Sequence, residues 1–135
     1  MRIAFGADDE NECVDAVRAR LSERAEVVAV SADLAWPSMA RAVGELVARG
    51  DADLGVLMCW TGTGTAIAAN KVRGVRAAQA SDPWIARGAR LWNDANVLAM
   101  SLKRLAPDVA VEVLRAFLET PAADPDEAAN IAAIE

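Results

Sequence analysis

The feature that most constrains the fold is the alternation of short, continuous apolar runs with segments whose apolar residues recur at helical spacing. In the first helical segment, Val14, Val17 and Leu21 fall on one face. Strands that are apolar throughout are typical of a parallel sheet covered by helices on both faces. The sequence therefore predicts a doubly wound α/β domain with a parallel sheet of about five strands. The expected strands are residues 2–7, 26–30, 53–58, 75–78 and 96–100.

The length of 135 residues suits a single domain, and we expect it to span residues 1–135. Pro83 and Pro107 each suit the first turn of a helix, and after Pro107 we expect an apolar stripe formed by Val111, Leu114, Phe117 and Leu118. Pro121 should end that helix. The Ala-rich tail, residues 121–135, should form a last helix or pack on a partner subunit.

The charge balance argues against several classes of partner. The chain has 14 Lys and Arg against 20 Asp and Glu, a formal net charge of −6, and no basic run. Such a chain lacks the counterion-releasing surface of nucleic-acid binders and is repelled by anionic membranes. No apolar stretch is long enough to span a bilayer, and no signal-peptide core precedes Asp8. We expect a cytoplasmic protein with no nucleic-acid or membrane partner.

The chain contains no histidine and only two cysteines, Cys13 and Cys59. An imidazole base and a His-containing metal site are therefore excluded. The cysteines are too far apart in sequence for a CxxC motif, and we expect both to be reduced thiols. Any proton transfer must use a carboxylate, a thiol, a hydroxyl or an amine.

The segment from Cys59 to Lys71 is the strongest candidate for a site, because a thiol ends an apolar strand and a Gly/Thr loop opens a helix. Gly62 and Gly64 should take positive φ angles and turn backbone N–H groups inward, which would hold an oxyanion. The same surroundings favour a thiolate at Cys59. A cysteine at a strand end is, however, more often a small buried hydrophobic residue. The Walker and dinucleotide-binding glycine patterns are both incomplete here.

Five blocks of sequence occur in order along the chain: residues 6–9 (GADD), 59–64 (CWTGTG), 68–71 (AANK), 74–77 (GVRA) and 93–99 (NDANVLA). Together they resemble the type B ribose-5-phosphate isomerases and the related galactose-6-phosphate isomerase subunits. The similarity covers nearly the whole chain in order. It implies a Rossmann-like three-layer α/β/α sandwich that forms a homodimer or higher oligomer with active sites shared between subunits.

The resemblance also implies an activity, that of an aldose–ketose isomerase of carbohydrate metabolism. The cysteine matching Cys59 would take a proton from the carbon beside the carbonyl and give a cis-enediolate. The resemblance places Thr61, Gly62 and Gly64 in the loop that holds the enediolate oxygens, and Asn93 and Asp8 in contact with substrate. No metal or organic cofactor is expected, because a 1,2-proton shift is redox-neutral within the substrate.

Several residues depart from the family pattern. Trp92 replaces the ring-opening histidine and Asp9 replaces a histidine near the start, while Trp36 replaces a tyrosine and Trp60 a glycine. Three of the four tryptophans thus fall at or beside predicted pocket positions. Taken alone, Asp8 and Asp9 would more often be a helix N-cap. The pocket is therefore predicted to be aromatic and drier, with Asp9, Trp36, Trp60 and Trp92 binding substrate.

The second departure concerns phosphate. The two C-terminal arginines of the family align with Asp126 and Asn130, while Lys103 or Arg104 keeps one cation near a third arginine. Carboxylate in place of guanidinium repels a dianion. We therefore predict a sugar or polyol-like carbonyl substrate other than ribose 5-phosphate. Two alternatives stay open: a non-catalytic subunit that pairs with a complete family member, and a different proton transfer, such as epimerisation, on a neutral carbonyl compound.

Overall fold

A computed structural model describes all residues, 1–135, and its centre is a five-stranded parallel sheet. The strand order is β2-β1-β3-β5-β4, with every neighbouring pair parallel. The predicted parallel α/β fold is confirmed, and the strands begin or end within two residues of the predicted bounds. They are β1 (Arg2–Ala7), β2 (Glu26–Ala29), β3 (Leu54–Cys59), β4 (Ala77–Gln79) and β5 (Val97–Ser101).

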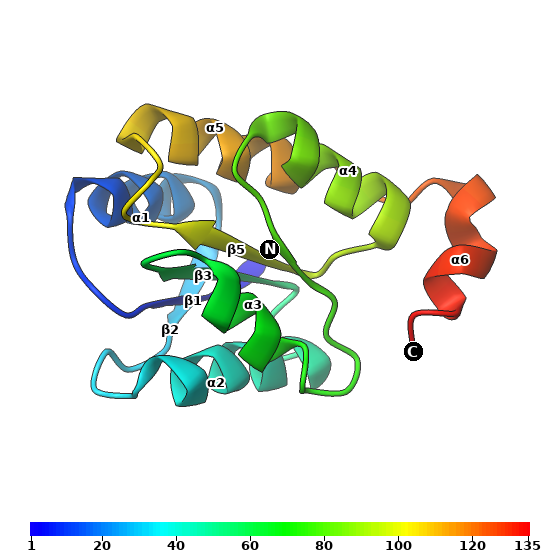
Figure 1. Ribbon diagram of the computed structural model, residues 1–135, viewed down its shortest axis with the longest axis horizontal. Coiled ribbons are helices and arrows are strands. Elements are labelled where there is room, and N and C mark those ends of the chain that lie inside the picture. Colours follow the sequence, from blue (N-terminus) through cyan, green and yellow to red (C-terminus); the bar gives the residue numbers. More distant parts are fainter.

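Helices cover both faces of the sheet, as Figure 1 shows. On one face α1 (Glu12–Arg24) and α4 (Pro83–Asn93) pack against α5 (Pro107–Leu118). On the other, α2 (Trp36–Ala48) packs against α3 (Thr63–Ala69). The result is a three-layer α/β/α sandwich, in which ligand sites are expected beyond the carboxyl ends of the strands.

Side-chain caps and prolines set the starts of the long helices. Asn11 Oδ1 accepts the Val14 N–H at 3.0 Å and begins α1, and Asp82 Oδ1 accepts the Ile85 N–H at 2.9 Å and begins α4. Prolines in the first turns of α2, α4 and α5 fit there because the first turn needs no N–H donor. These starts agree with the sequence pattern.

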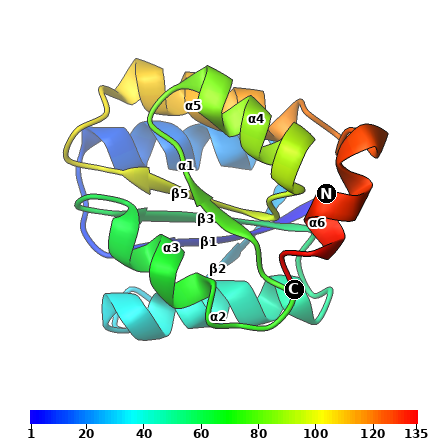
Figure 2. The same cartoon turned by 45° about the vertical axis from the view of Figure 1, so that its right-hand side comes forward.

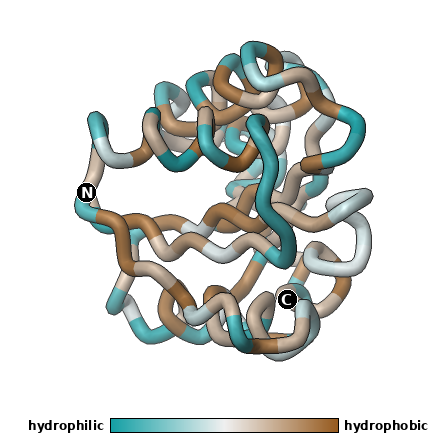
Figure 3. The backbone as a smooth tube through the Cα atoms, turned by 90° about the vertical axis from the view of Figure 1, so that its left-hand side faces the viewer, coloured by the Kyte–Doolittle hydropathy of each residue, from teal (hydrophilic) through white to brown (hydrophobic).

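The core consists of two apolar layers, one between the sheet and each helical layer. The larger layer includes Leu114 and Phe117 of α5, both fully buried. In Figure 3 the strands form a hydrophobic centre between the two sets of helices. The predicted α5 stripe was partly wrong: Val111 and Leu118 are only half-buried, and Val113 takes the inner position beside Leu114.

The C-terminal tail forms a short 3-10 turn, η1 (Pro125–Glu127), and the helix α6 (Ala128–Ala132), neither of which buries a residue. Figure 2 shows α6 beside the C-terminal end of α4, and the Asp124 N–H donates to the Leu91 carbonyl at 2.8 Å. None of the helices is both long and apolar enough to cross a membrane.

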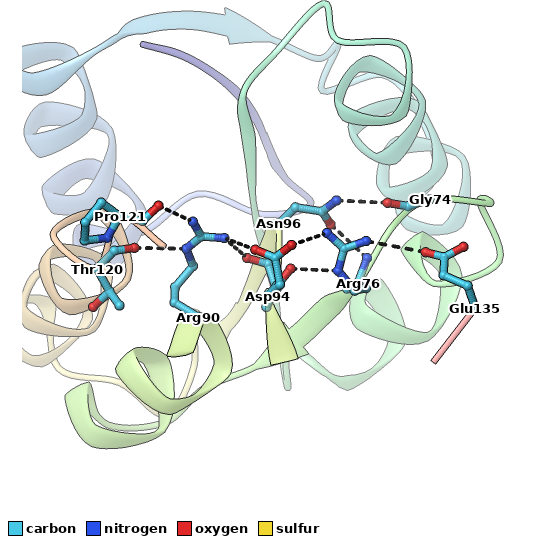
Figure 4. A network of polar contacts seen from close by, with 9 residues as sticks. Gly74, Arg76, Arg90, Asp94, Asn96, Thr120, Pro121 and Glu135 are labelled. Carbon is cyan, nitrogen blue, oxygen red and sulfur yellow. Dashed lines mark hydrogen bonds and ion pairs between the residues drawn. The ribbon is translucent and has the colours of Figure 1, made fainter. Parts of the chain in front are cut away.

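A partly buried network of polar contacts surrounds the start of β5. In this network Asp94 lies between the guanidinium groups of Arg76 and Arg90 (Figure 4). Asp94 binds Arg76 at 3.0 Å and Arg90 at 3.4 Å and has a left-handed backbone, with φ of 46°. Arg90 is only 8% exposed and also donates to the Ala95, Thr120 and Pro121 carbonyls. Desolvation lowers the pKa of Arg90, while the Asp94 carboxylate opposes that shift.

Candidate active site

The candidate site lies where the connections from β1 and β3 diverge at the carboxyl edge of the sheet. The strands are neighbours, with Ala7 beside Met58, so Asp8 follows β1 close to Cys59 at the end of β3. In an open parallel sheet this point of divergence leaves a crevice for a ligand. A cleft of about 460 Å³ opens there, lined by Asp8, Trp36, Cys59, Trp60, Thr61, Thr63 and Gly64.

The Cys59 side chain lies at the floor of this cleft and is 6% exposed. The Gly62 N–H donates to the Cys59 Sγ atom, with an N–S distance of 3.1 Å. Gly62 has a φ of 77°, as predicted, and a Cβ there would lie 2.9 Å from the Met100 carbonyl carbon. Only glycine fits this position, and its conformation directs an N–H donor at the sulfur.

A second polar group also contacts the sulfur. Thr65, in the first turn of α3, is fully buried, and its Oγ1 atom lies 3.3 Å from Cys59 Sγ. The same hydroxyl lies 3.3 Å from the Gly62 carbonyl oxygen. The sulfur therefore meets one amide and one hydroxyl in the protein interior.

Two carboxylates at the cleft have opposite electrostatic surroundings. Asp9 accepts the Glu10 N–H at 2.8 Å and the Trp60 Nε1–H at 3.0 Å, and these bonds, the first above all, lower the pKa of Asp9. Desolvation, and secondly the charge of Asp9, raise the pKa of Asp8. The Asp9 carboxylate therefore stays ionised and bonded to Trp60. Asp8 is the carboxyl that more readily holds a proton.

Lys103 lies beside Asp9 and Trp60. Its Nζ atom lies 4.7 Å from the centroid of the Trp60 ring and 4.0 Å from Asp9 Oδ2. The indole is thus held between a carboxylate at its N–H and an ammonium over its face. The predicted substrate-binding residues Asp9, Trp60 and Lys103 come together, although Asp9 and Lys103 do not themselves line the cleft.

Trp36 forms the opposite wall. A Cβ on Gly64 would lie 2.9 Å from the Trp36 ring, so the ring packs directly on the Gly64 backbone. The expectation of a positive φ at Gly64 was wrong, because α3 begins at Thr63 and Gly64 has helical geometry. Gly64 is needed for the close approach of an aromatic ring rather than for a turn.

Sequence reasoning missed three polar residues here. The Thr63 hydroxyl lies 2.7 Å from the Thr61 hydroxyl, and Gln79 Nε2 donates to the Thr61 carbonyl at 2.8 Å. The third is Thr65, beneath the sulfur. The repeated Gly–Thr pattern marked the loop, but only the turn into α3 determines which hydroxyl faces which group.

A family model described as Ribose/Galactose Isomerase matches residues 3–134. The chain belongs to this family. A ribose-5-phosphate isomerase B from Clostridium thermocellum has a TM-score of 0.92 at 31% sequence identity, covering 99% of this chain and 95% of that one.

Two curated relatives of the ribose/galactose isomerase family match a shorter region. Ribose-5-P isomerase B of Listeria innocua is 42% identical over 85 residues, 63% of this chain and 57% of the relative. D-erythrulose-4-phosphate isomerase of Pectobacterium atrosepticum is 38% identical over 84 residues, 62% of this chain and 55% of the relative. These matches therefore span less than two thirds of the relatives' length.

Within one chain, the remaining predicted site residues lie at the other edge of the sheet. Trp92 and Asn93 end α4, next to the start of β5, whereas Cys59 ends β3 (Figure 1). Asp126 and Asn130 belong to η1 and α6 beside that end of α4, and both are exposed. A single copy of this family member does not bring these residues to the Cys59 cleft.

Helix α4 instead has its own aromatic surface, formed by Trp84 in its first turn and Trp92 in its last turn. Trp84 and Trp92 are 69% and 41% exposed, and their rings meet edge to face with centroids 5.4 Å apart. Asn93 lines a separate hollow with Arg73 and Arg76. No group of three or more Cys, Asp and Glu side chains is arranged to hold a metal ion.

Proposed function

We propose that this protein is an aldose–ketose isomerase in which Cys59 is the proton-transferring base. The observation that carries the proposal is the Cys59 sulfur at the floor of a cleft, with the Gly62 N–H directed at it from 3.1 Å. A thiolate is stabilised by such a donor and is a competent base for a carbon-bound proton.

The proposed reaction is a 1,2-proton shift. The Cys59 thiolate takes the proton from the carbon beside the substrate carbonyl, the C–H electron pair forms the carbon–carbon double bond, and the carbonyl oxygen takes up the negative charge. The resulting cis-enediolate then receives the proton back at the neighbouring carbon. Electrons and atoms balance within the substrate, so the step consumes no oxidant or reductant.

A second proton must move between the two substrate oxygens, and Asp8 is the better placed of the two carboxyls. Asp9 is held by Trp60 and Lys103, whereas Asp8 lines the cleft and has a raised pKa. A raised pKa brings a carboxyl closer to the operating pH, where one group can both accept and return a proton. We assign this transfer to Asp8 and a supporting role to Asp9.

The charges around the cleft favour a substrate with less negative charge than ribose 5-phosphate. Asp8 and Asp9 contribute two carboxylates, and the one ammonium beside them, Lys103, lies near Asp9. Trp36 and Trp60 offer apolar faces on which the C–H groups of a sugar can stack. A neutral or weakly anionic sugar, or a polyol-like carbonyl compound, is the substrate class that fits.

We further propose that two copies of the chain form the complete site. The exposed pair Trp84 and Trp92 gives α4 an apolar surface of the kind that subunit interfaces cover. Because a single copy keeps Trp92 and Asn93 away from the Cys59 cleft, a shared site would require these residues from a second copy. Sedimentation at micromolar concentration should therefore show a dimer or larger oligomer.

The experiment that tests the activity is an NMR assay of aldose–ketose interconversion on a panel of neutral and phosphorylated sugars of four to six carbons. The proposal expects turnover of at least one neutral or weakly anionic sugar, and none of it in Cys59→Ala. Preference for ribose 5-phosphate would refute the substrate class.

Asp126 and Asn130 at the aligned arginine positions also favour a second candidate, an incomplete subunit. In that case the purified chain is inactive on the whole panel and gains activity only on mixing with a family member that carries the missing histidines and arginines. Turnover by the isolated chain excludes this candidate.

A further inference from the structure

Thr65 is a polar residue that neither the fold nor the proposed reaction yet explains. It is 0% exposed, one of four polar or charged residues buried in the chain. Its hydroxyl contacts two groups, Cys59 Sγ and the Gly62 carbonyl oxygen, each at 3.3 Å. Since the Gly62 N–H also contacts the sulfur, Cys59, Gly62 and Thr65 form a closed ring of hydrogen bonds.

The hydroxyl has a single proton, so it can donate to only one of these two groups at a time. When Cys59 is a neutral thiol, Thr65 can donate to the Gly62 carbonyl and accept the S–H proton. When Cys59 is a thiolate, the sulfur has no proton to give and is the stronger acceptor. The hydroxyl then turns to donate to the sulfur, which leaves the thiolate with two donors.

The Gly62 carbonyl tolerates this change because it has another partner. The Ala66 N–H donates to the same oxygen at 3.3 Å as part of the first turn of α3. Rotation of the Thr65 hydroxyl therefore leaves no buried carbonyl without a donor. The exchange requires rotation about one bond and no movement of the backbone.

We propose that Thr65 is the positioning residue of Cys59, a hydroxyl that stabilises the thiolate before proton abstraction and releases the sulfur once it carries the proton. The proposal rests on Cys59 being the base. In addition, the fraction of Cys59 present as thiolate would depend on Thr65, a side chain that does not contact the substrate. Thr61 and Thr63 line the cleft and are free to contact substrate, whereas Thr65 is not.

The Thr65 hydroxyl changes its hydrogen-bond acceptor each time the sulfur gains or loses a proton. Proton transfer from the substrate carbon to Sγ breaks a C–H bond and forms an S–H bond. The new S–H then donates to Thr65 Oγ1, and the Thr65 proton returns to the Gly62 carbonyl. The reverse rotation accompanies return of the proton to the neighbouring carbon, so the ring is restored after each turnover.

The test measures how the reactivity of Cys59 depends on pH, which requires no sugar. Wild type, Thr65→Val and Thr65→Ser are treated with iodoacetamide from pH 5 to pH 10, and alkylation of each cysteine peptide is followed by mass spectrometry. Valine keeps the shape and removes the hydroxyl, and serine keeps the hydroxyl. Cys13 is the internal reference, because it is buried and burial raises its pKa.

The proposal expects the midpoint of Cys59 alkylation to rise by about one pH unit in Thr65→Val, the shift corresponding to one lost hydrogen bond to a charged group. Thr65→Ser should restore the wild-type midpoint, and Cys13 labelling should be unchanged in both. At pH values below the midpoint, the rate of substrate proton exchange should fall about tenfold in Thr65→Val and recover at higher pH.

Two results would overturn the proposal: a Thr65→Val midpoint equal to that of wild type, or an equal shift in Thr65→Ser. If valine prevents folding, as faster Cys13 labelling would show, Thr65→Ala gives the same comparison with serine. A shifted midpoint in a protein that isomerises no sugar would refute the proposed function while supporting the role of Thr65.

Discussion

Replacing Gly62 by alanine tests how the backbone prepares the sulfur. Gly62 has a φ of 77°, and an added Cβ would lie 2.9 Å from the Met100 carbonyl carbon and 3.1 Å from the Ser101 nitrogen. The left-handed conformation costs an L-residue about 1–2 kcal/mol, and overpacking against β5 adds about 1–3 kcal/mol. We expect Gly62→Ala to lower the free energy of unfolding by about 2–5 kcal/mol.

Gly50→Ala is the matched control. Gly50 has nearly the same φ, 78°, but no atom lies within 4 Å of an added Cβ. It therefore reports the conformational cost alone, about 1–2 kcal/mol. Urea unfolding followed by circular dichroism measures both variants. The difference between them isolates the contact of the Gly62 turn with β5.

The same Gly62 variant should also lose reactivity at Cys59, because relief of the clash moves the Gly62 N–H away from the sulfur. Iodoacetamide labelling near neutral pH should slow for Cys59 in Gly62→Ala and remain unchanged in Gly50→Ala. If Gly62→Ala were no more destabilised than Gly50→Ala and labelled at the wild-type rate, the described geometry of the turn would be incorrect.

Three further variants follow from the same contacts. Arg90→Met should lower the free energy of unfolding by about 2–5 kcal/mol in urea, since the buried Ala95 and Thr120 carbonyls lose their donor while Asp94 keeps Arg76. Arg49→Met, at an exposed ion pair, should cost no more than about 1 kcal/mol. Because the pKa of Asp8 is raised, its contribution to stability is lost as pH rises, so Asp8→Asn should raise the melting temperature at pH 7 and not at pH 3. The pKa of Asp9 is lowered, so its contribution to stability is instead lost as pH falls. Asp9→Asn should therefore lower the melting temperature, measured by calorimetry, at pH 7 and not at pH 2.

Much of the sheet could be predicted, because its three central strands, β1, β3 and β5, are almost entirely buried and mostly apolar. Gly62 was predictable for a related reason: a glycine directly after a buried strand and before a helix marks a turn that other residues avoid. Gly64 was not, since its requirement comes from the Trp36 ring, which is distant in sequence. Packing between distant segments leaves no local pattern.

The roles of the threonines in the loop after β3 could not be predicted from local sequence either. Thr61, Thr63 and Thr65 look equivalent in sequence, yet the first two line the cleft and the third lies beneath the sulfur. Their different positions follow from α3 beginning at Thr63. Asp94, in the block that carries the family resemblance, binds Arg76 and Arg90 and has a structural role.

The central claim is that Cys59 takes a proton from carbon, and exchange of the substrate's carbon-bound hydrogen with deuterium from D2O tests it most directly. The sugar with the highest turnover in the panel would be followed by NMR with wild type, Cys59→Ala and Cys13→Ala. We predict that Cys59→Ala exchanges at least about 100-fold more slowly than wild type, the contribution expected of a positioned base, and that Cys13→Ala exchanges normally. Wild-type exchange rates in a folded Cys59→Ala protein would contradict the account.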